Sequence, residues 1–238
     1  MDANEIEVRG LRKDFDRRKV LKGIDFSLKK GGFLSVFGPN GAGKTTMIKI
    51  LSTLETPTKG EVTISGIDLM ADPIPIKKKI GLISHNPLLY GDLSAEENLR
   101  FYGVLYRVDD LESRIRELLE RVELSQRKYD YVRTFSQGMT QRLAIARALI
   151  HRPSILFLDE PHSGLDPHAV DILDGLLDDI RAEHTFIMVT HNLDKGLSLC
   201  SEAMILDGGK IVFFGEKKDI ERDMFESIYK KSVKGEIA

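Results

Sequence analysis

Residues 33–45, FLSVFGPNGAGKT, decide the fold. A short apolar run is followed directly by a glycine-rich turn, and residues 38–45 fit the pattern G-x-x-x-x-G-K-[ST] at every fixed position. Residues 45–54 have helical character and are stopped by Thr56, Pro57 and Gly60. A buried strand, a glycine loop and a helix in this order predict a phosphate-binding loop in an α/β fold.

The residue types of this loop suit the chemistry of holding phosphate. Glycines let backbone N–H groups point inward around phosphate oxygens, and the helix that follows presents its positive end to the same anion. Lys44 can reach the outer phosphates of a nucleotide, and the Thr45 hydroxyl can ligate Mg²⁺. A glycine loop without a ligand is the alternative. The candidate phosphate contacts are Gly38, Pro39, Asn40, Gly41, Ala42, Gly43, Lys44, Thr45 and Thr46.

Two further segments place polar side chains at the ends of apolar strands. Residues 155–160, ILFLDE, end in two carboxylates, of which Asp159 can hold the Mg²⁺ shell and Glu160 can polarise an attacking water. Residues 186–190, FIMVT, lead to His191 at the end of a second strand, where ligands gather in parallel sheets. Solvated acids after a core strand and a structural histidine are the alternatives.

Residues 135–142, FSQGMTQR, predict a second helix N-terminus suited to an anion. Ser136 and Gly138 precede an apolar helical face that continues to about residue 150. A capped helix without a ligand is the alternative here. His162, just after the two carboxylates, is interpreted as a loop residue near the site. Cys200 is given only a structural role.

The rest of the chain predicts an α/β body that carries a helical insertion. The first 35 or so residues alternate as strands, and strand signals return at residues 155–158, 186–189 and 203–206, with a hairpin turn at 207–210. Between them, residues 94–150 are helical and open with a capping box, SAEE. The last 20 or so residues predict a peripheral helix.

Composition excludes several classes of protein. The 238 residues are 42% hydrophobic and carry 35 basic and 37 acidic side chains, which argues against disorder and against a nucleic-acid partner. One cysteine gives no intrachain disulfide framework. No apolar run approaches the ~18 residues of a membrane span, and the N-terminus lacks a secretory signal. A cytoplasmic protein is therefore expected.

These segments, taken in this order, resemble the ATP-binding subunits of ABC transporters over about residues 6–215. FSQGMTQR stands at the family's signature segment, ILFLDEP at its Walker B strand, SGLD (163–166) at its D-loop and Thr190-His191 at its switch histidine. The resemblance implies a P-loop NTPase fold of the ABC type: a mixed sheet core with an N-terminal antiparallel part. It also implies a single ATPase domain over 1–238, with a helical subdomain at about 94–150.

The resemblance further implies a site shared by two chains in a head-to-tail dimer. ATP held by Lys44 and Thr45 of one copy would meet Ser136 and Gly138 of a second copy or a homologous subunit. In this scheme Asp159 holds Mg²⁺, Glu160 is the general base and His191 contacts the γ-phosphate. Asp166 acts across the interface, and Phe15 stands where the family places an aromatic ring against adenine.

The resemblance also implies a transmembrane permease as partner, and with it a peripheral location on the inner face of the cell membrane. Residues 87–106 are the expected contact surface, with core packing as the alternative for Phe101 and Leu105. ATP hydrolysis would drive transport through this separate subunit. A non-transport ABC protein acting on nucleic acid or the ribosome is disfavoured, since the chain has one ATPase unit, no long coiled-coil insertion and no basic excess.

One position departs from the family pattern. His85 stands where most members have the glutamine that links Mg²⁺ and the attacking water to the helical insertion, and imidazole lacks the paired donor and acceptor of an amide. We expect His85 to take over this catalytic and metal-contacting role. Together with Asn86 and residues 89–99, it resembles the ATP-binding proteins of the haem exporter in cytochrome c biogenesis. ATPase subunits of drug, lipid or polysaccharide exporters are the alternative.

Overall fold

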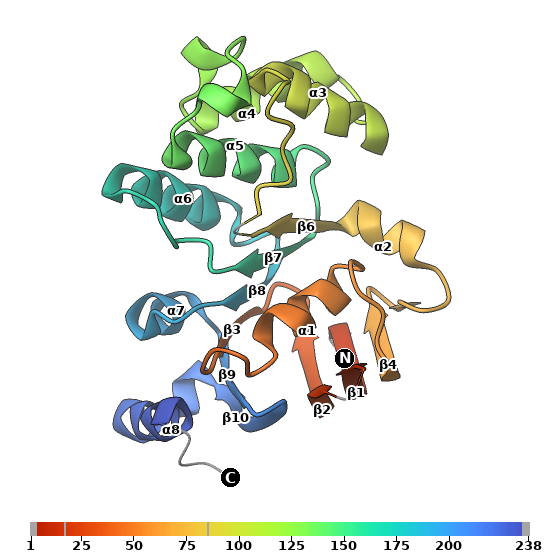
Figure 1. Ribbon diagram of the computed structural model, residues 1–238, viewed down its shortest axis with the longest axis vertical. Coiled ribbons are helices and arrows are strands. Elements are labelled where there is room, and N and C mark those ends of the chain that lie inside the picture. The colour runs from red at the N-terminus through yellow and green to blue at the C-terminus, as the bar shows by residue number, and fades with distance from the viewer. Residues whose placement is uncertain (1–3, 17, 85, 235–238) are drawn as a thin grey trace.

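The computed structural model describes residues 4–16, 18–84 and 86–234. Two sheets form its framework (Figure 1). The four-stranded sheet has the order β2-β1-β4-β5 and is antiparallel. Its strands are β1 (Asn4–Phe15), β2 (Arg18–Lys29), β4 (Lys59–Ile64) and β5 (Ile67–Asp68). Buried Leu21, Ile24, Phe26 and Leu28 alternate with polar residues along β2, so this sheet presents one apolar face to the core.

The six-stranded sheet has the order β10-β9-β3-β8-β7-β6 and is parallel except for the β9–β10 hairpin. Its strands are β3 (Phe33–Phe37), β6 (Ile80–Ile83), β7 (Ile155–Asp159), β8 (Thr185–Val189), β9 (Glu202–Asp207) and β10 (Lys210–Glu216). Every residue of β3, β7 and β8 is buried. Both faces of these strands are therefore covered, as their continuous apolar sequences predict.

Helices lie on both sides of the six-stranded sheet. Those of the α/β body are α1 (Lys44–Leu51), α2 (Pro73–Lys79), α6 (Pro167–Ile180), α7 (Leu193–Leu199) and α8 (Arg222–Lys234). One buried apolar cluster fills the space between this sheet, α1 and the antiparallel sheet, and a second lies under α4, α5 and α6. The sheet that carries the phosphate loop is thus held between two cores, which fixes the ends of its strands.

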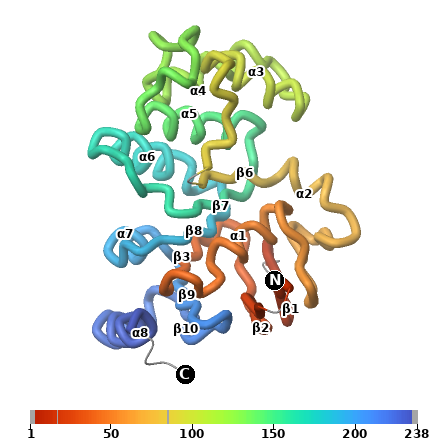
Figure 2. The backbone as a smooth tube through the Cα atoms, viewed as in Figure 1, coloured from red at the N-terminus to blue at the C-terminus, as the bar shows by residue number. Residues whose placement is uncertain are grey.

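The helical region stands at the end of the molecule far from the antiparallel sheet (Figure 1). It contains α3 (Ala95–Tyr106), α4 (Leu111–Arg121) and α5 (Gln137–Leu149). The predicted capping box is present, because the Ser94 hydroxyl accepts from the Glu97 N–H and the Glu97 carboxylate accepts from the Ser94 N–H at 2.7 Å. In Figure 2 the N-terminal strands and α8 lie toward the opposite end.

The predicted hairpin turn at residues 207–210 is present, but the C-terminal helix packs differently from the prediction. Gly208 and Gly209 both have positive φ, 50° and 82°, as a two-residue hairpin turn requires. The predicted peripheral helix exists as α8, yet its Phe225 is fully buried. The Phe225 ring meets the rings of Phe37 and Phe213 edge-on, with centroids 5.3 and 5.2 Å away. The helix is therefore part of the core beside the phosphate loop.

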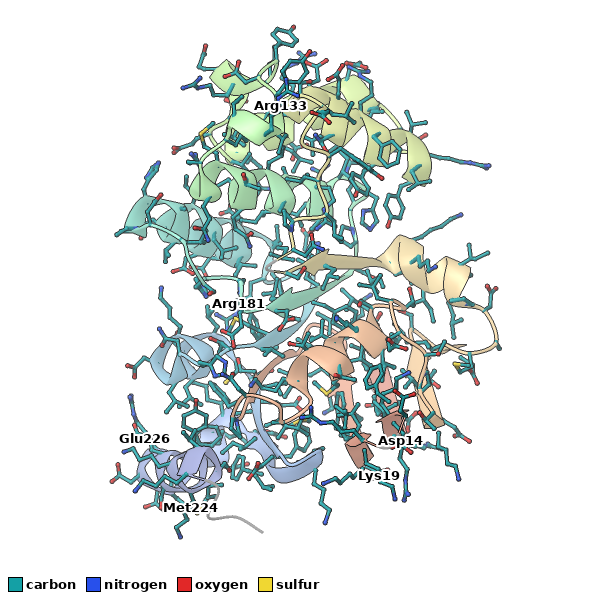
Figure 3. All side chains as sticks on the ribbon, viewed as in Figure 1. Asp14, Lys19, Arg133, Arg181, Met224 and Glu226 are labelled. Carbon is teal, nitrogen blue, oxygen red and sulfur yellow. The ribbon has the colours of Figure 1, made fainter. Side chains whose placement is uncertain are left out.

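Charged side chains are found along the whole length of the molecule, and Figure 3 labels some of them, from Arg133 at one end to Glu226 at the other. None of the helices in the described ranges combines the length and the hydropathy that crossing a bilayer requires.

The docking of α8 gives a prediction for stability. Phe225→Ala removes a fully buried ring and leaves a cavity, so it should lower the free energy of unfolding by about 3–5 kcal/mol. Its neighbour Met224 is 45% exposed, and Met224→Ala should change stability by about 0.5 kcal/mol or less. Urea unfolding of the two variants measures both effects. Equal effects would contradict the packing of α8 into the core.

Candidate functional site

The loop of residues 38–45 joins β3 to α1 in a shape that only glycine permits at two positions. Gly38 has φ +147°, and a Cβ atom there would lie 2.0 Å from the backbone oxygen of Leu206 on β9. Gly43 has φ +106°, and a Cβ atom there would lie 2.6 Å from the Leu21 side chain of β2. The loop is thus pressed against both sheets, which leaves its backbone amides at the mouth of a cavity.

Lys44 is buried at the first position of α1 and folds back over its own loop. Its ammonium donates to the backbone oxygens of Gly38 at 2.7 Å and Pro39 at 3.0 Å. Burial lowers the pKa of Lys44, while the carboxylates of Glu160 and Asp159 act in the opposite direction. A partly desolvated cation with two carbonyl partners is placed to meet an incoming anion.

Asp159 and Thr45 meet beside this lysine. Asp159 ends β7 and is 3% exposed, and its carboxylate accepts from the Thr45 hydroxyl at 3.2 Å. A hydroxyl and a carboxylate next to a phosphate loop match the ligands that Mg²⁺ takes in nucleotide sites, where phosphate and water complete its shell. The described residues hold no group of three or more His, Cys, Asp or Glu that would cage a metal alone.

Glu160 follows Asp159 with a left-handed backbone, φ 52°, which turns its side chain toward the cavity. Burial raises the pKa of its carboxyl, partly offset by the hydrogen bond from the His191 backbone N–H, 3.3 Å from Oε2. A raised pKa makes the carboxylate a stronger proton acceptor.

His191 lies opposite, where β8 ends. Its Nε2 is 3.0 Å from Glu160 Oε1, although the two groups lack the alignment of a hydrogen bond. Burial and the charge of Lys44 lower the pKa of His191, with Asp159 acting the other way. A neutral imidazole beside a carboxylate is therefore the state that the site favours near neutral pH.

A cavity of about 360 Å³ brings Lys44, Thr45, Glu160 and His191 together. Its lining residues are Arg18, Val20, Asn40, Gly41, Gly43, Lys44, Thr45, Thr46, Glu160, Val189 and His191. Arg18 was not predicted from the sequence. Its guanidinium would lie 3.6 Å from a Cβ atom at Gly41. The only sequence signal that could have indicated Arg18 is its place in a short run of basic residues.

Phe15 lies beside this cavity without lining it. It is 42% exposed at the end of β1 and pairs in register with Arg18 of β2. The Lys13 ammonium lies 4.6 Å from the centre of its ring. An exposed ring next to the phosphate loop can stack on a planar ligand.

Ser136, Gly138 and Asp166 lie in a second place. Ser136 caps α5 by accepting from the Met139 N–H at 3.3 Å. A Cβ atom at Gly138 would lie 2.9 Å from the Asp166 carboxylate, and Asp166 itself caps α6. None of the three lines the cavity at Lys44. The chain therefore carries two separate groups of predicted nucleotide contacts. The position of His85 lies outside the described residues.

Comparison with known proteins decides the family. The family described as "ABC transporter" matches residues 21–163. The linearmycin resistance ATP-binding protein LnrL of Bacillus subtilis (strain 168) is 36% identical over 90% of this chain and 70% of its own length. The chain belongs to the ABC transporter family. It is an ATP-binding subunit of that family and an ATPase.

Other relatives broaden the picture. The daunorubicin resistance ATP-binding protein DrrA3 of Streptomyces coeruleorubidus is 34% identical over 94% of this chain and 72% of its own length. A spermidine/putrescine import ATP-binding protein of Clostridium novyi (strain NT) is 34% identical over 92% of this chain and 64% of its own length. A dimeric ATP-binding cassette, solved in a post-hydrolysis state with ADP and Pi, aligns with TM-score 0.82 and 27% identity over 90% of this chain and all of that one.

The fold and the family predicted from the sequence are therefore confirmed. The roles given to individual residues, and the finer resemblance to the haem exporter, remain predictions.

A second hollow, a groove, is lined by residues of both the α/β body and the helical region. Its volume is about 210 Å³, and its lining includes Leu54, Leu88, Tyr102, Tyr106 and His151. The His151 ring stacks on Tyr106 with centroids 4.0 Å apart. Its Nε2 lies 2.9 Å from the backbone oxygen of Ile80, where it donates in the neutral form.

His151 gives a prediction for pH. Burial lowers its pKa from 6.5 to about 4, so below pH 6.5 the unfolded chain binds a proton that the folded chain does not. The free energy of unfolding should therefore keep its full value above about pH 6.5 and fall by up to about 3 kcal/mol as the pH approaches 4. His151→Gln keeps an N–H donor for Ile80 but does not titrate, so its unfolding free energy should vary less between pH 7 and pH 4.5. Parallel pH profiles for the two proteins in urea unfolding would show that His151 titrates normally.

Proposed function

We propose that this chain hydrolyses ATP with Mg²⁺ as one half of a head-to-tail dimer, and that a separate transmembrane subunit uses this energy to move a substrate across a membrane. The single observation that supports it most is one cavity lined by Lys44, Thr45, Glu160 and His191, with Asp159 bonded to the Thr45 hydroxyl. Residues 1–238 then act as one ATPase domain with a helical subdomain at about 94–150.

Within the cavity each group has a distinct role. Backbone amides of residues 38–45 and the Lys44 ammonium hold the phosphates, which displace the carbonyl partners of Lys44. Thr45 and Asp159 would hold Mg²⁺, which would supply positive charge next to the phosphate oxygens. Phe15 stacks on adenine.

Glu160 and His191 act on the attacking water and the γ-phosphate. Glu160 orients the water and takes its proton, and burial makes its carboxylate the stronger base. His191 contacts the γ-phosphate, and its backbone N–H, 3.3 Å from Oε2, also keeps the Glu160 carboxylate in place. His85 is proposed to bridge this pair to the helical subdomain.

The second group of contacts calls for a second chain. Ser136 and Gly138 stand at the positive end of α5, where Ser136 is exposed, and neither residue lines the cavity of its own chain. In a head-to-tail pair this end meets the phosphates bound by the partner, and Asp166 lies at the same interface. The similarity to an ATP-binding cassette that was solved as a dimer in a post-hydrolysis state supports this arrangement.

The membrane subunit is proposed to dock on the groove and on the exposed side of α3. Tyr90, Phe101, Val104 and Leu105 are 49%, 43%, 65% and 64% exposed, so core packing does not account for Phe101 and Leu105. Exposed apolar side chains gathered beside a groove are typical of an interaction surface. Docking there would hold the chain peripherally on the inner face of the membrane.

The cargo is set by that partner, and two observations bear on it. The resistance relatives support export of drug-like compounds. The segment around His85, Asn86 and residues 89–99 instead supports haem export for cytochrome c biogenesis. Export is proposed on these two observations, although the spermidine/putrescine import relative is as similar in sequence as the daunorubicin resistance relative.

Site-directed cross-linking tests the docking surface. Val104→Cys and Leu105→Cys should each capture a polytopic membrane protein in membranes that contain the complex, and mass spectrometry identifies the partner. The natural Cys200 is 2% exposed and should not react. Met224→Cys, at the opposite end of the molecule in Figure 3, is the matched control. Capture from position 224 alone would contradict the proposed docking surface.

A further inference from the structure

His162 forms a polar chain with residues of two helices that the proposed mechanism does not use. It lies three residues after Asp159, and its Nε2 is 2.8 Å from Asp174 Oδ1 on α6. The other oxygen of Asp174 accepts from the ammonium of Lys195 on α7. The side chains of His162 and Asp174 are only 14% and 22% exposed. This row of side-chain contacts therefore links the loop after β7 to α6 and α7.

The contacts fix the proton on His162. Burial alone would raise the pKa of Asp174, but the hydrogen bonds from Lys195 and His162 outweigh it and lower that pKa. An ionised carboxylate only accepts, so Nε2 of His162 carries the proton. Nδ1 of the same ring is buried and has no partner among the described residues. Among the described residues, Asp174 is therefore the only hydrogen-bond partner of this ring.

The two ends of the row of contacts, His162 and Lys195, belong to different halves of the proposed site. At one end, residues 163–166 pack on the start of α5: a Cβ atom at Gly164 would lie 2.2 Å from the Gln137 amide. In the proposed dimer this surface faces the partner copy. At the other end, Lys195 lies in the first turn of α7, where Asn192 accepts from its N–H at 3.0 Å. Asn192 directly follows His191, which serves the chain's own ATP.

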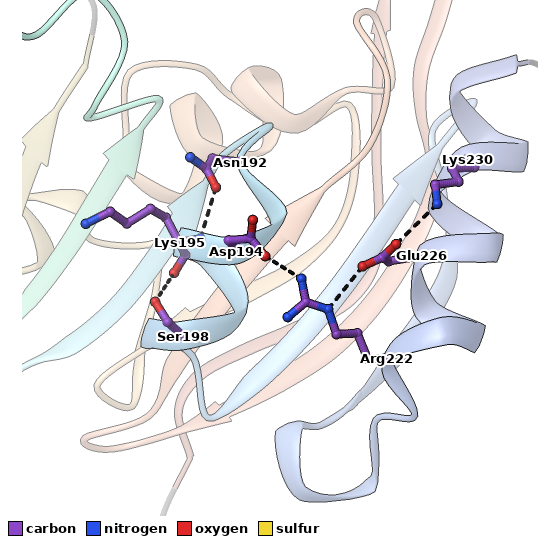
Figure 4. A network of polar contacts seen from close by, with 7 residues as sticks. All are labelled: Asn192, Asp194, Lys195, Ser198, Arg222, Glu226 and Lys230. Atoms are coloured by element: carbon purple, nitrogen blue, oxygen red, sulfur yellow. Dashed lines mark hydrogen bonds and ion pairs between the residues drawn. The ribbon is translucent and has the colours of Figure 1, made fainter.

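The other side of α7 is tied to α8 by a more exposed network (Figure 4). Arg222 pairs with Asp194 of α7 and donates to Glu226 at 3.0 Å, and Lys230 lies 3.2 Å from Glu226. Arg222 and Asp194 are 61% and 79% exposed. Exposed pairs of this kind contribute little, and none of these residues reaches the loop after β7. Arg222 therefore provides a matched control, because it contacts the same helix α7 from α8.

We propose that His162 is a positioning residue for ATP hydrolysis, which acts through Asp174 and Lys195 to hold the segment after His191 in register with residues 163–166. It thereby couples the chain's own nucleotide site to the surface that completes the partner's site. This inference rests on the proposed function.

Steady-state ATPase kinetics of His162→Leu and His162→Gln test the proposal. Leucine fills the space without a donor, whereas the amide of glutamine reaches the position of the Nε2–H. His162→Leu should lower kcat about tenfold, the size of a charge-assisted hydrogen bond lost in the transition state, with KM for ATP within about twofold. His162→Gln should stay within about twofold of wild type. A purely structural role would not separate kcat from KM or be rescued by glutamine.

Two controls make the outcome unambiguous. Arg222→Ala should leave kcat unchanged, because it loosens α7 only on its exposed side. Lys44→Ala should abolish hydrolysis; if it does not, the proposed function fails whatever His162 does. Should His162→Leu unfold, Lys195→Met breaks the same chain at a residue that is 40% exposed and should give the same kcat loss. Wild-type kcat in the donor-less variant, equal losses for leucine and glutamine, or an equal loss in Arg222→Ala would overturn the proposal.

Discussion

The close contact between the glycine loop and β9 is the constraint on which the site depends. With a Cβ position at Gly38 only 2.0 Å from a backbone oxygen of Leu206, the loop has no freedom to move toward the sheet. β3 is central in the sheet and buried throughout, so the loop inherits a rigid starting point. Lys44 then reaches back to the carbonyl oxygens of its own loop, and α1 begins at a fixed place.

The neighbouring strands bring the remaining groups to the same edge. β7 and β8 run parallel to each other and β8 runs parallel to β3, so Asp159, Glu160 and His191 arrive where the loop begins. Burial raises the pKa of Glu160 and lowers that of His191, as the proposed roles of a base and a neutral imidazole require. The cavity lacks contacts from Ser136 and Gly138 of its own chain, and this gap is what a second copy would fill.

Much of this could be predicted from the sequence, because the decisive residues sit in short motifs at strand ends. The glycine spacing of residues 38–45 requires one backbone path, and the apolar runs before Asp159 and His191 require buried parallel strands. Such local patterns place side chains without knowledge of the whole fold. The capping box at Ser94 and the turn at Gly208 are predictable for the same reason.

Features that arise from long-range packing could not be predicted. The burial of Phe225 depends on Phe37 and Phe213, which are distant in the sequence. Arg18 lines the cavity only because a hairpin turns it toward the loop. His162 gains its partner Asp174 from α6, and Asp174 in turn accepts from Lys195 of α7. Leu105 is exposed although it is an apolar residue of a helix that buries Leu99.

Light scattering of Glu160→Gln with and without ATP tests the central claim most directly. The claim is that the groups at Lys44 and the groups at Ser136 meet on one nucleotide only when two chains join. Loss of the base should leave ATP bound but unhydrolysed, so the variant should have monomer mass without nucleotide and dimer mass with ATP and Mg²⁺. Lys44→Ala under the same conditions should remain monomeric. A Glu160→Gln protein that stays monomeric at saturating ATP would contradict the account.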